Sequence, residues 1–211
     1  MKKLITAAAA AVAVLALAAA AMAALAPGVY DPGNTGCPKA TYAKGVLHLE
    51  KNCPTATDAA AGAEITGVAG EQFQSASFTL ASGSQCQGGS PRFDVVTTTG
   101  LFFLGCNNVT PTTNANGTVT YLFTADTLSA AGQQVPTPTG TIKFVSVLID
   151  VQGTADLSHI TFNGKPQKVT ARGDLSRPCK NGGWKTFTNP KFKNQGQCVK
   201  ALIHARNTTR K

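Results

Sequence analysis

The sequence predicts an all-β protein built as an antiparallel β-sandwich, and three observations favour this fold class. First, Thr, Ser, Val, Gly and Ala are abundant in the 211-residue chain while only 14% of its residues are charged, and β-branched residues fit a pleated sheet well. Second, short stretches alternate apolar and polar residues with the period of two that a half-buried strand requires. Third, turn-forming Gly, Pro and Asn residues separate these stretches at the spacing typical of sandwiches.

Five stretches carry the strand pattern most clearly, and they are residues 75–80, 92–95, 101–104, 118–124 and 141–151. The loop 97–100 predicts a hairpin between the second and third stretches, and Asn116-Gly117 predicts a turn before the fourth. In the fifth and longest stretch the apolar phase shifts at Phe144-Val145, which predicts a β-bulge. In each strand, the polar residues are expected on the solvent side.

The N-terminus has the features of a secretory signal peptide. A short basic start precedes an Ala/Val/Leu run that reaches Ala26, and the Ala-Met-Ala sequence at 21–23 offers a cleavage site. We expect residues 1–23 to be removed, which leaves no transmembrane segment in the mature chain. The alternative is a retained membrane anchor, because the apolar run is about 20 residues long. The expected location is extracellular, either released or held at the cell surface.

The six cysteines all follow the predicted leader. An even number of cysteines in an exported chain favours disulfides over metal ligation. We expect sequential pairing, because each successive pair brackets one local segment, and each closed loop would contribute about 3 kcal/mol. The expected bridges are Cys37–Cys53, Cys86–Cys106 and Cys179–Cys198.

Charge divides the chain into two parts. Residues 24–164 contain five basic and nine acidic residues, whereas residues 165–211 contain twelve basic residues and one acidic residue, Asp174. We therefore divide the mature chain into a sandwich domain, 24–170, and a basic appendage, 171–211. The basic excess indicates an anionic partner. Two alternatives stay open: the charge serves solubility alone, or the appendage docks on the acidic face of its own sandwich.

The appendage is expected to be a loop and a short helix joined by the third disulfide. Asn189-Pro190 is a favourable helix start, so we expect a helix from Pro190 to about Ala205. Its candidate ligand-binding residues are an aromatic that could stack on a sugar and lysines that could attract an anionic polymer: Trp184, Lys185, Lys191, Lys193 and Lys200. Nucleic acid is less favoured, because no nucleic-acid fold signature is present. Zinc at Cys179, Cys198 and His204 is also less favoured, because the usual Cys-x-x-Cys chelate is missing.

No catalytic motif stands out. The sequence has no Gly-x-Ser-x-Gly elbow, His-Glu-x-x-His helix or phosphate-cradling loop. Its carboxylates are scattered, and sequence spacing reveals no acid/base pair of the kind that a glycosidase needs. We therefore expect a non-catalytic protein that needs no cofactor for a reaction.

Two stretches resemble known proteins. "SVLIDVQGTADLSHITFNG", residues 146–164, resembles the closing strands of jelly-roll carbohydrate-binding modules of the galactose-binding type, over less than a tenth of the chain. "CKNGGW…FKNQGQCV" resembles an ending that recurs on exported, uncharacterised bacterial proteins. The first resemblance implies a jelly-roll-like sandwich. It also implies a structural calcium, for which Asp150, Asp156 and Glu50 are the candidate ligands. The alternative is that Asp150 and Asp156 are turn-forming or exposed residues.

The expected function follows from these features. We expect an exported, non-catalytic protein that binds a glycan or an anionic cell-wall polymer through the sandwich and the basic appendage. One alternative is a structural or assembly domain whose appendage only caps the sandwich. Another is a polysaccharide-acting hydrolase. The sequence does not determine an oligomeric state.

Overall fold

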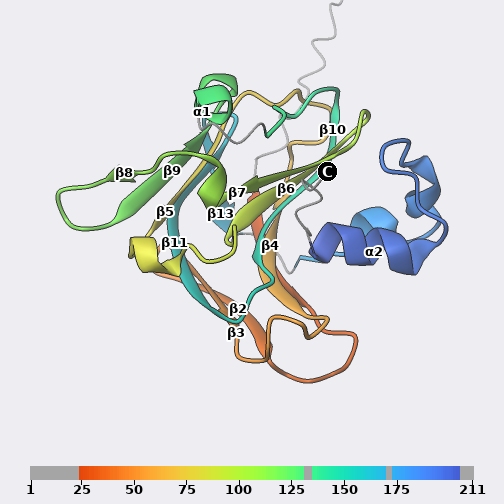
Figure 1. Cartoon of the computed structure of the whole chain (residues 1–211), viewed down its shortest axis with the longest axis horizontal. Helices are drawn as coiled ribbons and strands as arrows, with labels where there is room; N and C mark the ends of the chain where they lie inside the picture. The colour runs from red at the N-terminus through yellow and green to blue at the C-terminus, as the bar shows by residue number, and fades with distance from the viewer. Residues whose placement is uncertain (1–23, 131–134, 170–172, 205–211) are drawn as a thin grey trace, which may run out of the picture.

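The computed structural model describes residues 24–130, 135–169 and 173–204, and it confirms an all-β sandwich of two sheets (Figure 1). All strand pairs are antiparallel except one short parallel pair between β1 and β13. The predicted signal peptide, 1–23, and the end of the predicted appendage, 205–211, lie outside the described residues. The part of the appendage that is described, residues 173–204, is called the C-terminal unit below.

The two sheets interleave segments that are distant in sequence. The first sheet has the order β13 (Lys168–Val169), β1 (Ala24–Tyr30), β4 (Ala60–Thr66), β10 (Ile142–Ile149), β6 (Arg92–Thr97) and β7 (Leu101–Gly105). The second has the order β2 (Pro38–Ala43), β3 (Val46–Lys51), β11 (Gly153–Phe162), β5 (Ala76–Leu80), β9 (Val119–Phe123) and β8 (Thr112–Thr113), with β12 (Lys165–Pro166) paired to β11.

An inner core fills the space between the sheets. It contains the apolar residues that alternate along each strand, among them Phe78, Phe93, Phe123, Leu157 and Phe162, all fully buried. The rings of Phe78 and Phe93 have centroids 5.5 Å apart, and those of Phe93 and Phe123 are 5.8 Å apart and nearly perpendicular. Edge-to-face packing of this kind adds to the area term of hydrophobic burial. The period-two pattern thus identifies the inner core correctly.

Local predictions for the strands are confirmed. The predicted hairpin joins β6 to β7, and the register of β10 against β6 shifts between Ile142 and Phe144, just before the predicted bulge position at Phe144-Val145. Whether the sandwich belongs to the jelly-roll class stays a prediction.

The cysteines pair sequentially, as Cys37–Cys53, Cys86–Cys106 and Cys179–Cys198. The first bridge ties the start of β2 to the residues after β3. The second ties the segment after η1 (Gly83–Gln85) to the end of β7, at η2 (Cys106–Asn108). The third closes the C-terminal unit on itself. All three bridges suit a protein of an oxidising compartment.

The C-terminal unit contains η3 (Arg177–Cys179), η4 (Gly183–Thr186) and α2 (Gln195–Ile203); the remaining helix, α1 (Ala125–Ala130), follows β9. The predicted helix start at Pro190 is wrong, because a better N-terminus lies downstream. The Asn194 side chain accepts a hydrogen bond from the Gln197 backbone N–H, and the Gln197 side chain accepts one from the Lys193 backbone N–H. This exchange satisfies N–H groups at the helix start.

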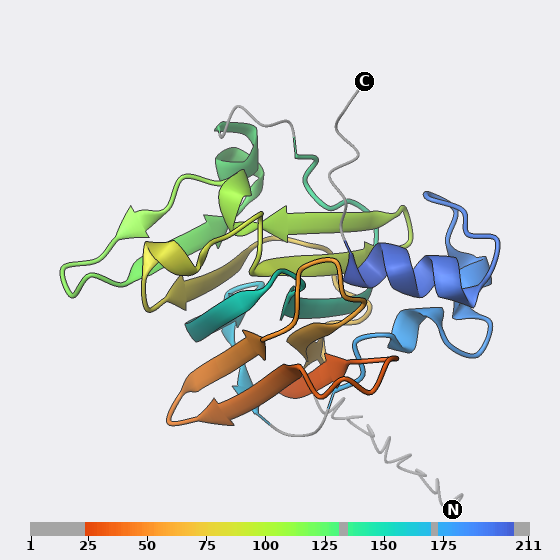
Figure 2. The same cartoon turned by 60° about the horizontal axis from the view of Figure 1, so that its bottom comes forward.

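The C-terminal unit lies against the outer face of the first sheet (Figures 1 and 2, blue). It has no separate core. A second apolar cluster, the outer core, combines residues of the sheet with residues of the unit. The sheet contributes Ala60, Val96, Phe144 and Leu148, and the unit contributes Leu175, Cys179, Phe187, Cys198, Val199, Leu202 and Ile203. The first sheet is therefore buried on both faces.

Candidate binding surface on the C-terminal unit

A row of polar side chains crosses the outer face of the first sheet beneath the C-terminal unit. The strand register places Ser146 of β10 directly opposite Glu64 of β4 on one side and Asp94 of β6 on the other. All three are buried, with exposures of 4% or less. Glu64 pairs with Arg177, which comes from the C-terminal unit. The row therefore contributes a polar contact between sheet and unit within an otherwise apolar interface.

Burial has a strong effect on the two carboxyl groups of this row. It raises the pKa of Asp94 to about 7, although Arg92 beside it favours the charged form. Burial also raises the pKa of Glu64, and Arg177 opposes that shift. Two atoms of the row, Asp94 Oδ2 and Ser146 Oγ, have no hydrogen-bond partner among the residues that the structure describes. Asp94 has the pKa of a general acid or base, but its complete burial separates it from any substrate, and we assign it a structural role.

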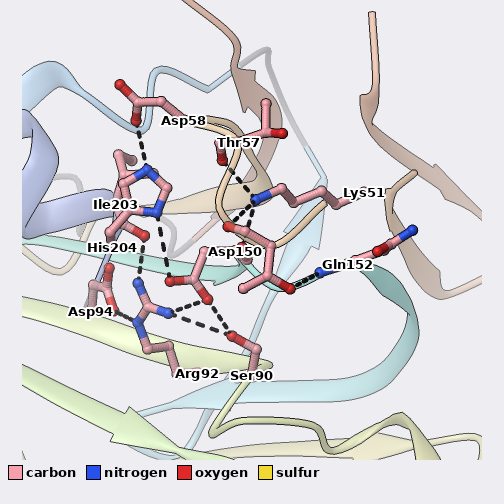
Figure 3. A network of polar contacts seen from close by, with 11 residues as sticks. Lys51, Thr57, Asp58, Ser90, Arg92, Asp94, Asp150, Gln152, Ile203 and His204 are labelled. Carbon is pink, nitrogen blue, oxygen red and sulfur yellow. Dashed lines mark hydrogen bonds and ion pairs between the residues drawn. The ribbon is translucent and has the colours of Figure 1, made fainter. Parts of the chain in front are cut away.

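Arg92 connects this row to the end of α2 (Figure 3). Its Nε donates to Asp94 Oδ1 at 2.7 Å, and its Nη1 lies 2.7 Å from Asp150 Oδ1. Its Nη2 donates to the backbone carbonyl of Ile203, also at 2.7 Å. Ile203 is the last residue of α2, where carbonyl groups lack helical partners and a cation is favourable. Arg92 thus anchors the C-terminus of the helix to the sheet.

His204 makes a second connection at the same place (Figure 3). Its Nε2 lies 2.6 Å from Asp58 Oδ1, and its Nδ1 lies 4.0 Å from Asp150 Oδ2. Lys51, which is fully buried, donates to the backbone carbonyls of Thr55, Thr57 and Asp150 at 3.1, 2.9 and 2.7 Å. Lys51 thereby holds the loop that presents Asp58 to the imidazole. Burial lowers the pKa of Lys51, whereas Asp150 and Asp58 oppose that shift.

These contacts define an ionic anchor, made of Arg92, Asp94, Asp150, His204 and Asp58. Sequence reasoning did not identify it as a unit. Arg92 and Asp94 alternate with apolar residues, so they were expected on the solvent side of a half-buried strand. That expectation is wrong, because the C-terminal unit covers the outer face. The sequence does contain one indication that the outer face is covered. The basic appendage has apolar residues, and these need a surface on which to pack.

The candidate ligand-binding residues of the unit have different environments. Trp184 is half-buried against the outer core, and Lys185 Nζ lies 5.5 Å from its ring centroid. The indole is therefore not a free platform for a sugar. The lysine side chains all reach solvent, and within the described part of the chain none lies within ion-pair distance of a carboxylate. These lysines, called the lysine surface below, are Lys185, Lys191, Lys193 and Lys200.

The predicted calcium ligands are not brought together, so the predicted calcium site is wrong. Glu50 and Asp156 lie on the outer side of the second sheet, where Glu50 faces Lys39 and Asp156 pairs with His48 at 2.7 Å. Asp150 lies at the first sheet and belongs to the ionic anchor. Among residues 24–130, 135–169 and 173–204, no group of three or more His, Cys, Asp or Glu side chains could hold a metal ion.

The zinc alternative is also wrong. Cys179 and Cys198 are joined in a disulfide, and the His204 ring nitrogens face Asp58 and Asp150. The third cysteine pair thus serves to close the C-terminal unit.

None of the helices in the described residues is long and apolar enough to cross a membrane. Comparison of this chain with protein-family models, curated proteins and solved structures finds no match. The resemblance to carbohydrate-binding modules therefore stays a prediction, and the case for a function depends on the geometry described above.

Proposed function

We propose that this chain is an exported, non-catalytic binding protein that attaches to an anionic extracellular polymer through its C-terminal unit. The observation that carries the proposal is the lysine surface: four exposed lysines that, among the described residues, have no carboxylate partner. Three disulfides and the features of a signal peptide support an extracellular setting.

The way in which the unit is held supports binding as its role. A flexible basic tail loses conformational entropy when it binds, and this loss weakens the complex. Here the disulfide Cys179–Cys198, the outer core and the ionic anchor fix the backbone that carries the lysines. Only the lysine side chains remain to be ordered when a polyanion binds.

Retention on an insoluble anionic polysaccharide, at low and at high salt, tests the proposal. One variant combines Lys191→Gln, Lys193→Gln and Lys200→Gln. The matched control removes the same charge from the sandwich by Lys39→Gln, Lys44→Gln and Lys165→Gln. Deleting residues 171–211 is a poorer test, because it exposes Phe144, Leu148 and Val96 to solvent.

The proposal expects wild-type protein to be retained at low salt and released at high salt, since exposed charges are screened. The variant of the C-terminal unit should lose most of this retention and the control should keep it. If both variants lose retention equally, retention depends only on the net charge of the protein, and the proposal is contradicted.

The second candidate is a structural role, and the outer core favours it specifically. The unit covers four apolar residues of the first sheet that would otherwise face water. If wild-type protein is not retained on any anionic polymer, the unit is a cap and this second candidate replaces the first.

A further inference from the structure

A hollow lies between the first sheet and the C-terminal unit, on the side away from the ionic anchor. Its volume is about 180 Å³, and residues of both parts line it. Phe144 and Val96 come from the sheet, and Pro178, Thr186 and Phe187 come from the unit. Ligand pockets for drug-sized molecules usually measure roughly 300–1,000 Å³. This hollow is therefore the size of one small ring with a substituent.

Two cations flank the apolar lining. Lys143 sits in the β-bulge, between Ile142, which points into the inner core, and Phe144, which points into the outer core. Bulges redirect side chains in this way, and they are frequent next to functional sites. Without the bulge, strict alternation would place the residue before Phe144 on the inner side of the sheet. Instead Lys143 is exposed and lines the hollow.

Arg177 supplies the second cation. Its guanidinium lies 5.4 Å from the Phe144 ring centroid, and its side chain is 57% exposed. One of its nitrogens pairs with Glu64, so Glu64 offsets its charge in part. Arginine has five N–H donors in a planar fork, and the others are not used by Glu64. Lys143 has no carboxylate within ion-pair distance among the described residues, so the hollow keeps a positive excess.

We propose that this hollow binds a single acidic sugar unit of the anionic polymer, an inference that rests on the proposed function. The carboxylate of the sugar would lie between Lys143 and Arg177, because a guanidinium favours carboxylates. The apolar face of the ring would pack on Phe187 and Pro178. The Thr186 hydroxyl donates to the Gly183 carbonyl at 2.8 Å, which leaves its oxygen free to accept from a sugar hydroxyl.

The position of the hollow suits a polymer. Thr186 and Phe187 directly follow Lys185, and the Phe187 ring contacts Phe192 at a centroid distance of 5.1 Å, between Lys191 and Lys193. A polysaccharide with one sugar in the hollow would therefore pass close to the lysine surface. In this arrangement the hollow selects the acidic sugar, and the lysines contribute affinity that does not depend on the sugar sequence of the polymer.

Titration of the disulfide-bonded mature protein with three small probes tests the site by NMR shift changes. The probes are D-glucuronate, neutral methyl glucoside and glycerol 3-phosphate. We expect glucuronate to bind with a Kd that is roughly millimolar, as suits so small a ligand. Methyl glucoside should bind at least about tenfold more weakly, because it lacks the charge-assisted contact. Preference for glycerol 3-phosphate would overturn the acidic-sugar assignment.

Two variants test whether glucuronate binds in the hollow. Lys143→Met removes one cation from an exposed position, and Thr186→Phe fills the hollow from a second exposed position. Each should weaken glucuronate binding about tenfold, with a thermal unfolding curve that confirms folding. The Lys39→Gln, Lys44→Gln, Lys165→Gln variant removes three charges from the sandwich, away from the hollow and the lysine surface; it is the control and should bind glucuronate as wild type does. Undiminished binding in both hollow variants would contradict the inference.

The two proposals fail in different ways. If wild-type protein is retained on the polymer but does not bind glucuronate, the hollow is not a sugar site and the lysine surface alone explains attachment. If the protein is not retained on any polymer, the proposed function fails. The assignment of the hollow to a sugar of that polymer is then overturned as well, even if free glucuronate binds.

Discussion

The two faces of the first sheet differ in how they are buried. The inner core is apolar throughout and joins strands whose alternation is visible in the sequence. The outer core lies beside the ionic anchor, and seven of its eleven buried residues come from the C-terminal unit. A strand with alternating polar residues can therefore be buried on both sides. A later segment of the chain can supply both the cover and the countercharges.

The charged groups also explain why the unit sits where it does. Apolar packing alone is tolerant of small shifts, whereas buried charges require defined partners. Arg92 meets Asp94, Asp150 and the Ile203 carbonyl together, which fixes the end of α2 in one position. We therefore expect changes in the anchor to affect the outer core much more than the inner core.

The largest effect is expected from Arg92→Met. This change leaves Asp94 and Asp150 without their shared cation and the Ile203 carbonyl without its donor, and breaking a buried pair costs about 3–5 kcal/mol. Urea unfolding measures the loss. The control is Lys39→Met, which removes the largely exposed ion pair with Glu50 and should cost less than about 1 kcal/mol. Similar losses in both variants would show that the anchor contributes little.

A slightly smaller effect is expected from removing the third disulfide by Cys179→Ala and Cys198→Ala. The chain-entropy model gives about 3 kcal/mol for a loop of this size. Trp184, the only tryptophan of the chain, lies in this unit and reports on it by fluorescence. We expect its transition to precede the loss of β-sheet circular dichroism. In a Cys37→Ala, Cys53→Ala control the two signals should coincide, and coincidence in both variants would refute a locally stabilised unit.

The raised pKa of Asp94 predicts that the free energy of unfolding depends on pH. Its pKa in the folded protein is about 7, above the ordinary value of 3.8. Between these values the folded state keeps a proton that the unfolded state has lost. This contribution to the free energy of unfolding is therefore complete below about pH 4 and is lost as pH rises through 7.

Asp94→Asn should flatten this part of the pH profile, because the amide does not titrate. Asp126→Asn, at an exposed position of α1, is the matched control and should keep the wild-type profile. Chemical denaturation at several pH values between 4 and 8 measures both. A wild-type slope retained by Asp94→Asn would assign the effect to another group.

The smallest effect concerns the start of α2. Asn194→Ala removes the side chain that accepts from the Gln197 N–H and should cost about 1 kcal/mol. Asn189→Ala changes the residue that the sequence suggested as the cap and should cost little, because Asn189 is exposed and precedes the helix by several residues. The Trp184 fluorescence transition separates the two. A larger loss of stability in Asn189→Ala than in Asn194→Ala would place the helix start at Pro190.

Much of the fold could be predicted from the sequence. The period-two alternation identified the strands around Phe78, Phe93 and Val119, and the phase shift at Phe144 identified the bulge. These are local properties, because alternation and turn residues act over a few positions. The disulfides were also predictable, since each pair closes one short segment.

The candidate site was predictable only in part. The lysine surface follows from composition, because lysines without nearby acids stay in solvent. The ionic anchor does not, because its members Asp58, Arg92, Asp150 and His204 meet only through the order of the strands and the packing of the C-terminal unit on the first sheet. The calcium prediction is wrong for the same reason, the order of the strands. Asp150 and Asp156 are close in sequence but lie at different sheets. The hollow depends on a bulge meeting a distant turn, which sequence spacing alone cannot show.

The most direct test of attachment through the C-terminal unit is the salt dependence of polymer binding. The dissociation constant for a soluble polyuronate is measured between about 50 and 200 mM salt for wild type and for the Lys191→Gln, Lys193→Gln, Lys200→Gln variant. We predict a steep loss of affinity with salt in wild type. In the variant the logarithmic slope should be smaller by roughly 0.7–0.9 for each lysine that contacts the polymer. Equal slopes in the two proteins would contradict the claim that the C-terminal unit is the attachment surface.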